Sequence, residues 1–561
     1  MAPPVDVNTA STEAHPNVWV PVRDEGLFNP KKMRIITVGA GHAGLMMAYK
    51  MRHEVKCESY VDHVIYEKNH DVGGTWLENR YPGIACDVPA HIYTFSWEPN
   101  PNWTEYYVGG DEIWHYIKDT SDKYDLARDV QFKSKVLEAI WNEPRGKWEI
   151  KIDQNGTIIS DECDVFIDCS GALNKWNWPK IEGIENFKGH LVHSAKWDSG
   201  YDYTDKRVAV IGNGSSAIQI FPKLQKVAAH ITNYMRGPTW ISSGFSEELT
   251  PEGKNFKYTE EQKAEFRDNP ASLKKYRKDI EHAFNRFFYA LITDSPENKY
   301  MTEEYAKIMK RRLGGDEELA QEFIPKWSVG CRRLTPGEGY LEALQEKNAS
   351  HTWSPIVKIT ENGIITKDGK ECELDAIVCA TGFDVSYVPQ WKMQGYGGKT
   401  LESWREDPQS FLGIHAPDMP NYFIVNGPNC PIGHGSLLAV MEWTSEYILK
   451  WVVKLATEEI KSFAVKPDVL NEYNVYIQEF LKRTVWTSGC RSWYKSGTID
   501  GKVTAMYPGS IIHYKELVEN IRGEDFDYKY NGPNRFRFMG NGKALLELEG
   551  GHGDLSFYIK K

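Results

Sequence analysis

The sequence lacks the patterns that mark dithiol, zinc-ribbon and membrane-spanning proteins. None of its nine cysteines belongs to a Cys-x-x-Cys pair. This excludes a zinc ribbon and a vicinal dithiol redox centre, and we expect buried thiols in a reducing compartment with no bound metal. The longest uncharged stretch near the C-terminal third, 419–441, is interrupted by prolines and glycines. We therefore expect loops there and no membrane span.

An excess of positive charge and a leader pattern are also missing. Lys and Arg number 67 against 78 Asp and Glu, which gives a net charge of −11. Such a chain is a poor candidate for binding nucleic acid or an anionic membrane. Residues 1–16 show no basic segment followed by an apolar core, so we expect no secretory signal and a cytoplasmic location. The 41% hydrophobic and 26% charged residues are typical of a globular enzyme, with three or four units at ~150 residues each.

A dinucleotide-binding pattern stands near the start of the chain. A β-branched strand at 35–38 leads into Gly39, Gly41 and Gly44, a helical pattern follows, and a second strand ends at Glu67. The glycines let the backbone approach a pyrophosphate at the helix N-terminus, and the acid suits a ribose hydroxyl about 20 residues later. A coincidental glycine turn is the alternative, but the strand, helix and acid together favour a nucleotide site, most simply for FAD.

A second pattern of this kind follows a strand at 207–211. Gly212, Gly214, Ser215 and Ser216 open the next helical segment, and the following strand leads to Arg236 where an acid would stand. An arginine suits a ribose 2′-phosphate, which a carboxylate would repel. The pattern therefore predicts NADPH; the alternative is an ordinary surface arginine after a strand.

These two patterns predict an α/β protein with two Rossmann-like domains, the second inserted in the first. The segments 164–171 and 375–382 resemble each other as strands that return to a nucleotide domain, and 250–325 is a charged helical stretch. We expect an N-terminal arm at 1–30, the FAD domain at 31–180, and the NADPH domain at 181–375 with a helical insertion at about 250–325. The rest of the FAD domain is expected at 376–561, with a mobile loop near 486–505.

Two nucleotides on one chain suggest electron transfer between them. A disulfide reductase needs a cysteine pair beside the flavin, which is missing here, and an oxidase needs no pyridine nucleotide. A monooxygenase would use NADPH to reduce the flavin and then O₂ to form a flavin C4a-peroxide, which the protein must protect from water.

A motif between the two glycine patterns carries a family resemblance. Residues 187–198 fit F-x-G-x-x-x-H-x-x-x-W-[P/D] through Phe187, Gly189, His193, Trp197 and Asp198. This pattern resembles the signature of type I Baeyer–Villiger monooxygenases. Further segments similar to that family stand at 73–93, 330–344, 380–384, 427–436 and 490–495.

The resemblance implies a set of cofactor-binding positions. For FAD they are Gly39, Gly41, Gly44, Glu67, Gly74, Thr75, Trp76, Asp87, Tyr93 and Val136. For NADPH they are Gly212, Gly214, Ser215, Ser216, Arg236 and Arg332, with Trp493 on a mobile loop that closes over the nicotinamide side. Better-known members carry lysine at the position of Arg332, so this arginine keeps the charge but changes its geometry.

The resemblance also implies the catalytic groups. Arg333 matches the active-site arginine and Asp87 the carboxylate that holds it. A fixed guanidinium stabilises the negative charge of the peroxide and of its adduct with a ketone, and the carboxylate offsets its burial. The alternative for Arg333 is an ordinary phosphate-binding or surface charge. We interpret His193 as a hinge residue bonded to backbone rather than a base, and Trp197 as a packing residue.

The implied activity is a Baeyer–Villiger oxidation, in which NADPH and O₂ convert a small-molecule ketone to an ester or lactone. One alternative is a related flavin monooxygenase that oxygenates nitrogen or sulfur. Another is a non-catalytic flavoprotein that senses nucleotides, which would bind them without steady NADPH consumption. We expect a monomer or weak homo-oligomer.

Overall fold

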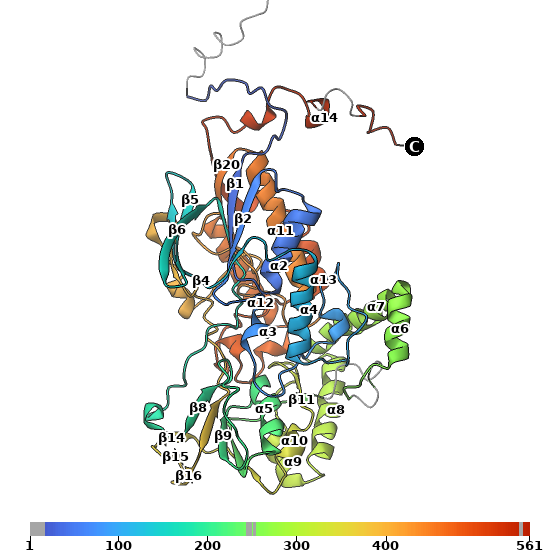
Figure 1. The fold of residues 1–561 in the computed structure, drawn as a ribbon, viewed down its shortest axis with the longest axis vertical. Coiled ribbons are helices and arrows are strands. Elements are labelled where there is room, and N and C mark those ends of the chain that lie inside the picture. Colours follow the sequence, from blue (N-terminus) through green and yellow to red (C-terminus); the bar gives the residue numbers. More distant parts are fainter. Residues whose placement is uncertain (1–16, 243–249, 251–253, 549–553, 561) are drawn as a thin grey trace, which may run out of the picture.

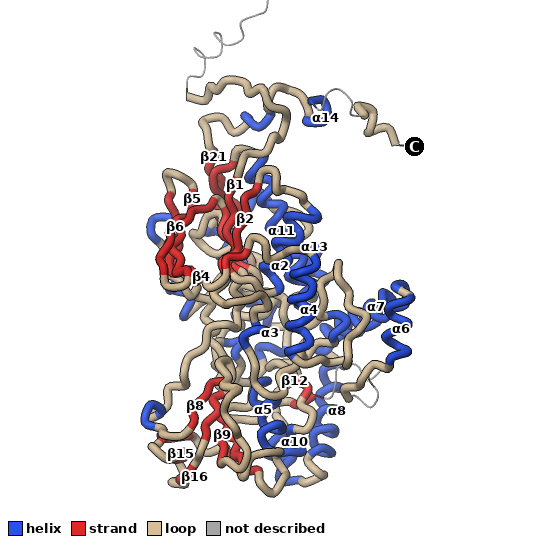
Figure 2. The backbone as a smooth tube through the Cα atoms, in the orientation of Figure 1, coloured by secondary structure: helices blue, strands red, loops and turns tan. Residues whose placement is uncertain are grey.

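Two parallel sheets, one above the other in Figure 1, divide the molecule. The computed structural model describes residues 17–242, 250, 254–548 and 554–560. Figure 2 shows their strands as separate groups joined by long loops. Residues 1–16 of the predicted N-terminal arm lie outside the described residues. The predicted fold class, α/β with two Rossmann-like units, is confirmed.

The upper sheet contains the first glycine pattern. In spatial order its parallel strands are β19 (Tyr422–Ile424), β7 (Val165–Asp168), β1 (Met33–Val38), β2 (Val61–Tyr66) and β3 (Val130–Gln131). Aliphatic side chains fill β1 and β2 because both faces of a parallel sheet are covered; Ile35, Ile36 and Ile65 are fully buried. After Gly41 the chain enters helix α2 (His42–Tyr49), which continues as a π-helical turn, η1 (Lys50–Glu54), and packs against α11 (Leu437–Thr457).

The lower sheet contains the second glycine pattern. Its parallel strands are β13 (Ala349–Thr352), β10 (His230–Tyr234), β9 (Arg207–Ile211), β17 (Ala376–Cys379) and β8 (His190–His193). Helix α5 (Ser215–Gln225) follows β9 and packs against α10 (Tyr340–Ala343).

One predicted boundary is wrong. The domain division placed 376–561 in the FAD domain, but β17 lies between β9 and β8 of the lower sheet, with Ala376 opposite Val208 and Cys379 opposite Ile211. An apolar strand can complete either sheet, so its composition does not reveal its neighbours. The rest of the domain division stays a prediction.

Two further sheets flank the parallel ones: a mixed sheet, in which β18 and β4 pair in parallel and the other strands pair antiparallel, and an antiparallel sheet. Beside the upper sheet lies a four-stranded sheet of β18 (Lys392–Gln394), β4 (Ser134–Asn142), β5 (Lys147–Gln154) and β6 (Thr157–Cys163). Beside the lower sheet lie β14 (Ile356–Ile359), β15 (Gly363–Thr366) and β16 (Glu371–Glu373). Trp141 and Trp148 of the first of these are buried against the upper sheet.

The predicted helical insertion is present. It consists of α6 (Glu260–Asp268), α7 (Pro270–Arg286), α8 (Pro296–Arg312) and α9 (Glu317–Phe323), and α6 and α7 project to one side in Figure 1. Side chains start these helices: Thr259 forms a capping box with Gln262, and Asn269 and Ser295 cap α7 and α8 before a proline. His91 lies among the rings of Tyr258, Phe266 and Tyr276. We call the parts of the molecule built around the upper and lower sheets the upper and lower units. His91 belongs to the upper unit, so these contacts join the insertion to it.

The remaining α-helices and β-strands belong to none of the sheets described above. They are α3 (Thr75–Glu78), α4 (Gly110–Lys123), β11 (Ile241–Ser242), β12 (Thr335–Pro336), β20 (Ile460–Val465), α12 (Pro467–Leu481), α13 (Ile511–Leu517), β21 (Phe526–Tyr530) and α14 (Leu545–Leu548). In the part of the chain that the structure describes, no helix combines the length and the apolar character needed to span a bilayer.

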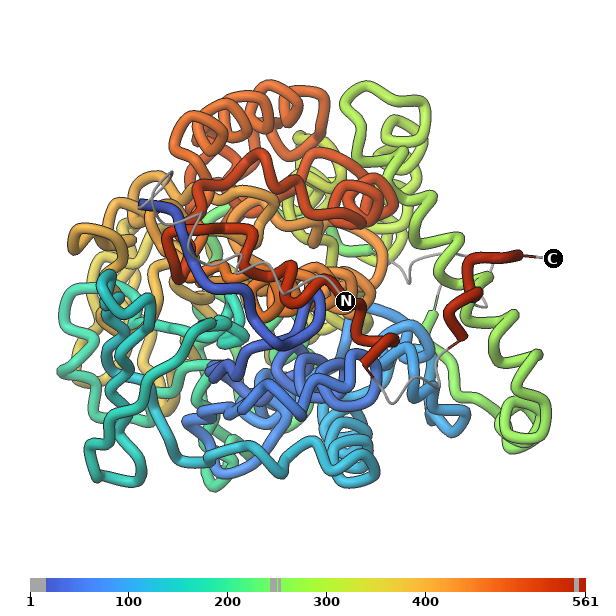
Figure 3. The backbone as a smooth tube through the Cα atoms, turned by 90° about the horizontal axis from the view of Figure 1, so that it is seen from above, coloured from blue at the N-terminus to red at the C-terminus, as the bar shows by residue number. Residues whose placement is uncertain are grey.

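The described part of the N-terminal arm lies along the C-terminal segment (Figures 1 and 3). Phe28 stacks on Phe538 with a centroid separation of 5.3 Å, and the Leu27 amide donates to the carbonyl oxygen of Lys543. Neither segment lines the large cavity of the molecule.

Candidate active site

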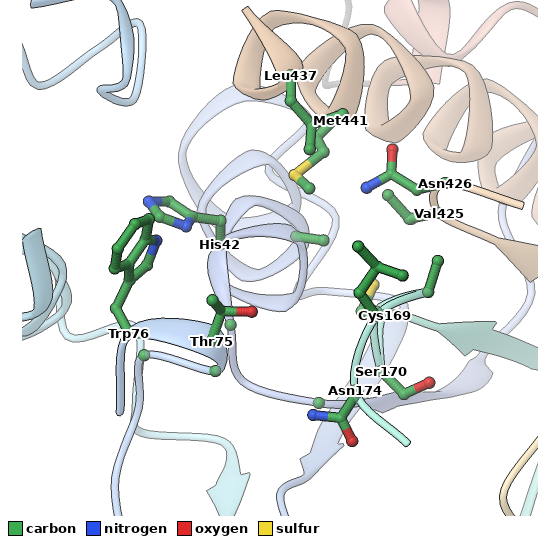
Figure 4. A pocket seen from close by; sticks show the side chains of 18 of the residues that line it. His42, Thr75, Trp76, Cys169, Ser170, Asn174, Val425, Asn426, Leu437 and Met441 are labelled. Atoms are coloured by element: carbon green, nitrogen blue, oxygen red, sulfur yellow. The ribbon is translucent and has the colours of Figure 1, made fainter. Parts of the chain in front are cut away.

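A cavity of about 490 Å³ opens between the two units. Figure 4 shows its inner part: Thr75, Trp76 and His42 face Cys169, Ser170 and Asn174, while Val425, Asn426, Leu437 and Met441 close a third side. Twelve of the predicted site residues line this cavity: Gly39, Gly41, Glu67, Gly74, Thr75, Trp76, Asp87, Tyr93, Val136, Ser215, Arg333 and Trp493.

Glycines shape the cavity wall where the first parallel strand ends. Gly39 has a φ of +99°, and a Cβ there would meet the Cys169 carbonyl oxygen at 2.7 Å. A Cβ on Gly74, whose φ is +52°, would lie 3.1 Å from the Cα of Gly41, so these two backbones are in close contact. Gly44 does not line the cavity; a Cβ on it would lie 2.0 Å from the Gly39 carbonyl oxygen, which leaves no room for any side chain. These glycines therefore allow the backbone to pack closely around the turn, and Gly39, Gly41 and Gly74 leave this part of the cavity wall without side chains.

Glu67 lies at the end of β2, in the cavity wall. Its Oε2 accepts a hydrogen bond from the Ala40 amide at 2.7 Å and its Oε1 one from the Asn69 amide at 2.7 Å. Burial raises the pKa of this carboxyl above its usual value, while the two amides oppose the shift. Through its bond from the Ala40 amide, Glu67 links the end of β2 to the glycine turn. Its carboxylate also lines the cavity, where it can accept a hydrogen bond.

Aromatic and apolar side chains form another part of the wall. Trp76 Nε1 donates to the Tyr93 hydroxyl at 3.2 Å, and the two rings meet edge to face. Val136 of β4 is buried and lines the cavity. Thr75, at the start of α3, also lines the cavity. These groups give an aromatic and apolar wall that suits a ring system.

The second glycine pattern lies beyond this cavity except at Ser215, whose Oγ is 2.6 Å from Thr335 Oγ1. Gly212 has a φ of +113°, and a Cβ there would meet the Ala380 carbonyl oxygen at 2.4 Å. Gly214 directly precedes α5, and Ser216 lies in its first turn. The backbone amides at this N-terminus form an anion-binding geometry of the same kind as at Gly41.

Arg236 and Arg332 bring two positive charges together beside α5. Arg332 Nη2 lies 3.9 Å from the position that a Cβ on Gly214 would take. Burial lowers the pKa of Arg332, and the nearby Arg236 lowers it further. Among the described residues no carboxylate forms an ion pair with either guanidinium. Two adjacent cations that have no carboxylate partner in the part of the chain that the structure describes fit a phosphate group.

Arg333 and Asp87 form a bidentate ion pair at the cavity wall. Nε donates to Oδ2 at 2.8 Å and Nη2 to Oδ1 at 2.7 Å, while Nη1 donates to the Ile432 carbonyl oxygen at 3.3 Å. The charge of Asp87 raises the pKa of Arg333 above its usual value. The Arg333 side chain keeps 36% of its surface exposed, so the fixed cation still faces the cavity.

Residues 486–505, here called the Trp493 loop, reach the cavity through Trp493. Trp493 opens a short 3₁₀ helix, η9 (Trp493–Lys495), and lines the cavity. Tyr494 is buried beside Arg333 and Arg332. Burial raises the pKa of Tyr494 to about 12, and the charges of the two arginines oppose this increase.

The cysteines depart from the expectation of free thiols. Cys331 and Cys490 form a disulfide, while the other seven cysteines are free. The expectation rested on the absence of Cys-x-x-Cys spacing, which says nothing about cysteines that the fold brings together from distant segments; these two are 159 residues apart.

The motif residues His193 and Trp197 lie at the edge of the lower sheet. His193 Nδ1 accepts from the Ala195 amide at 3.1 Å, Nε2 lies 3.2 Å from Thr381 Oγ1, and the ring stacks on Trp176. Trp197 stacks on Tyr203. Neither lines the cavity, and their interpretation as hinge and packing residues stays a prediction.

Sequence reasoning missed several cavity residues. His42 follows Gly41 directly and is buried, and this burial lowers its pKa to about 3, so its ring is neutral. Asn426 and Met441 come from the 419–441 stretch. The expectation of loops there is wrong in part, because the stretch contains β19 and, from Leu437, the first turn of α11. The position of a residue in the chain was the available signal. Residues that directly follow a strand of the parallel sheet, such as β19, lie at the carboxyl edge of that sheet, where ligands bind.

Comparisons with known proteins identify the family of the chain. Residues 31–308 match the family model described as flavin-binding monooxygenase-like. The chain is 48% identical over 538 residues to the FAD-binding monooxygenase tazF of Aspergillus terreus, covering 95% of both chains. It is 32% identical over 498 residues to a Baeyer–Villiger monooxygenase of Pseudomonas aeruginosa, covering 87% of this chain and 90% of that one.

A solved structure shares the fold. The cyclohexanone monooxygenase of Rhodococcus sp. Phi1 bound to NADP⁺ superposes with a TM-score of 0.75 at 26% identity, and the match covers 90% of this chain and 100% of that one.

Proposed function

Since the chain belongs to the type I Baeyer–Villiger monooxygenase family of flavin monooxygenases, we propose that it inserts one oxygen atom of O₂ next to a ketone carbonyl. The products would be an ester or lactone, water and NADP⁺. The observation that carries this proposal is the Arg333–Asp87 pair at the wall of the cavity, between the two glycine patterns.

FAD fits the cavity beside the first sheet. The bare backbone at Gly39, Gly41 and Gly74 would receive the pyrophosphate, and Glu67 Oε atoms can accept from a ribose hydroxyl. Thr75, Trp76, Tyr93 and Val136 would border the ring system. Gly44 would not contact FAD directly. Its lack of a side chain allows the glycine turn to form. When bound, FAD supplies the electron transfer from NADPH to dioxygen.

NADPH fits the second pattern. The amides at Gly212, Gly214, Ser215 and Ser216 would hold its pyrophosphate at the start of α5. Arg236 and Arg332 would hold the 2′-phosphate, since their paired charges have no internal counter-ion among the described residues. The name of tazF as FAD-binding and the NADP⁺ in the cyclohexanone monooxygenase structure support these assignments.

Arg333 would supply a positive charge that its ion pair with Asp87 holds at the cavity wall. As the ketone carbonyl is attacked, negative charge grows on its oxygen, and a fixed N–H donor at that point is worth about 3–4 kcal/mol in other enzymes. Asp87 accepts from two of the N–H groups of Arg333 and the Ile432 carbonyl oxygen from a third, which fixes the plane of the guanidinium and leaves two N–H groups for a ligand. Trp493 and Tyr494 cover this region and exclude water.

Oxygenation of nitrogen or sulfur is the second candidate, because the related flavin monooxygenases share both glycine patterns. The bidentate Arg333–Asp87 pair favours the ketone reaction, which develops an oxyanion that the heteroatom reactions do not.

Product analysis with ¹⁸O₂ on a panel of ketones and sulfides separates the two. We expect label in the ester or lactone oxygen, and rapid mixing of the NADPH-reduced enzyme with O₂ to show a long-lived, spectrally distinct phase. Immediate reoxidation with hydrogen peroxide as the only oxygen product would contradict the proposal.

A further inference from the structure

The disulfide joins the two segments that carry the candidate catalytic and nucleotide-closing side chains. Cys331 directly precedes Arg332 and Arg333, and Cys490 precedes Trp493 within the Trp493 loop. The seven other cysteines are free, so the one covalent cross-link among the described residues falls where this loop meets the arginine segment. Nothing in the assignment of the site requires such a link.

Non-covalent bonds order the loop at two further points. Asn429 Nδ2 donates to the carbonyl oxygens of Val503 at 3.0 Å and Met506 at 2.9 Å, which holds the C-terminal end of the loop. The buried ammonium of Lys495 donates to the carbonyl oxygens of Ser488 at 2.7 Å and Ile499 at 2.5 Å. The loop therefore folds around Lys495 as a compact unit.

At the N-terminal end of the loop Trp486 is buried beside Gly433, and the disulfide attaches the chain again four residues later, directly before the segment that carries Trp493. The neighbours Gly489 and Arg491 are exposed, while Cys490 and Cys331 are buried beneath them. The Arg491 guanidinium bonds within the loop, to the Gly497 carbonyl oxygen at 2.7 Å. A covalent link at this point restricts how far Trp493 can move from Arg332 and Arg333.

We propose that the Cys331–Cys490 disulfide is a positioning link that holds the Trp493 loop closed on the Arg332–Arg333 segment, so that retention of NADP⁺ depends on whether the pair is oxidised. This rests on the proposed function only in taking the bound nucleotide to be NADP⁺. In the reduced protein the loop opens more often, and the affinity for a ligand held by the closed state falls in proportion to the closed fraction.

Reduction of the pair is a simple exchange with a dithiol. One thiolate of the dithiol attacks a sulfur of the disulfide, the S–S bond breaks, and the second thiolate closes the dithiol to its own disulfide. Two electrons pass to the cysteine pair, and each cysteine takes up one proton. Lys495 Nζ lies 4.0 Å from Cys331 Sγ, so the ammonium favours Cys331 as the leaving thiolate and Cys490 as the sulfur attacked.

The experiment compares the oxidised holoenzyme with enzyme treated with dithiothreitol. The variants are Cys331→Ser/Cys490→Ser and, as a matched control, Cys372→Ser, which removes a free cysteine on β16 of the lower unit. Three quantities are measured without any ketone: thiols of the denatured protein, the Kd for NADP⁺, and the rate of tryptic cleavage after the exposed Arg491. Retained FAD and the Tm report whether the fold is intact.

We expect seven titratable thiols before reduction and nine after it in the natural chain. Reduction should weaken NADP⁺ binding about ten-fold, as for a loop closed one-tenth of the time, and speed cleavage at Arg491, with FAD content unchanged. The double serine variant should show the weakened values from the outset and no response to dithiothreitol, while Cys372→Ser should behave as the natural chain.

Nine thiols in the untreated protein, or an NADP⁺ Kd and a cleavage rate that do not respond to reduction, would overturn the proposal. A natural chain that binds and releases NADP⁺ as described but oxidises no ketone would contradict the proposed function and leave the positioning link standing. If NADP⁺ does not bind at all, the assignment of the nucleotide fails, and the cleavage rate at Arg491 still decides whether the disulfide holds the loop.

Discussion

Arg333 and Asp87 meet through two parallel hydrogen bonds, Nε to Oδ2 at 2.8 Å and Nη2 to Oδ1 at 2.7 Å, although 246 residues separate them in the chain. Asp87 comes from the loop that follows α3, and Arg333 from the segment before β12. The pair therefore exists only when the upper unit and the lower unit are packed together. It places a fixed cation at the cavity that both units border.

Replacing Arg333 should impair oxygen transfer and leave FAD binding intact. Arg333→Ala removes the fixed charge, and we expect kcat for ketone oxidation to fall by about 10²–10³-fold, the cost of one such donor. FAD should stay bound, since Arg333 makes no contact with the glycine turn. Arg333→Lys keeps the charge but loses the bidentate geometry and should recover only part of the rate. Product formation and FAD content are measured together; normal lactone formation by Arg333→Ala would remove this residue from the mechanism.

Arg236 and Arg332 should discriminate NADPH from NADH. Arg236→Ala and Arg332→Ala each remove one of two cations at the proposed 2′-phosphate site, so we expect the KM for NADPH to rise about 10-fold or more, with little change for NADH. Arg128→Ala is a matched control, because that arginine is exposed and forms ion pairs with Glu58 and Asp129 at a distance from both glycine patterns. Steady-state kinetics with both nucleotides decides the matter, and an equal loss for NADPH and NADH would refute the assignment.

The substitution Gly44→Ala tests whether the glycine turn requires a position without a side chain. A Cβ on Gly44 would lie 2.0 Å from the Gly39 carbonyl oxygen, so Gly44→Ala must displace α2 or the turn. We expect the free energy of unfolding to fall by about 3 kcal/mol or more and FAD to be lost. Gly532→Ala is the control, because nothing lies within 4 Å of a Cβ there. Thermal unfolding and flavin absorbance measure both effects, and an FAD-replete Gly44→Ala protein of natural stability would show this account of the turn to be wrong.

The local parts of the fold were predictable from the sequence. Strand, glycine turn and helix are consecutive in the chain, so β1 with the turn from Gly39 to Gly44, and β9 with the turn from Gly212 to Ser216, follow from residue order and type. The helical insertion was predictable for the same reason, since helix periodicity and caps such as Thr259 are local signals.

The contacts between distant segments were not predictable in this way. The neighbours of β17 depend on the packing of whole sheets, and its apolar sequence fits either one. The Cys331–Cys490 bond depends on the Trp493 loop reaching the arginine segment. The pairing of Arg333 with Asp87 came from family resemblance, because no spacing rule links residues so far apart.

Glu281 on α7 predicts a dependence of stability on pH. It is partly buried, and Arg277, one turn away, directs its donors to the His91 carbonyl oxygen at 2.9 Å and to Thr94 Oγ1 at 3.1 Å. Burial raises the pKa of Glu281 from 4.5 to about 7, against a smaller opposing effect of Arg277. A carboxyl whose folded pKa is raised favours folding while it is protonated, so its contribution is complete below pH 4.5 and is lost as the pH rises to about 7.

Glu281→Gln keeps the shape of this side chain and removes its titration. We expect the natural chain to lose up to ~3 kcal/mol of stability through this group between those pH values, and the variant to lack that part of the profile. Glu303→Gln on α8 is a control, because Glu303 belongs to the same insertion and has an exposed side chain. Denaturant unfolding at pH 4.5, 6 and 8 gives the two profiles. Parallel curves for the natural chain and Glu281→Gln would mean that the carboxyl is ionised without cost in the folded insertion.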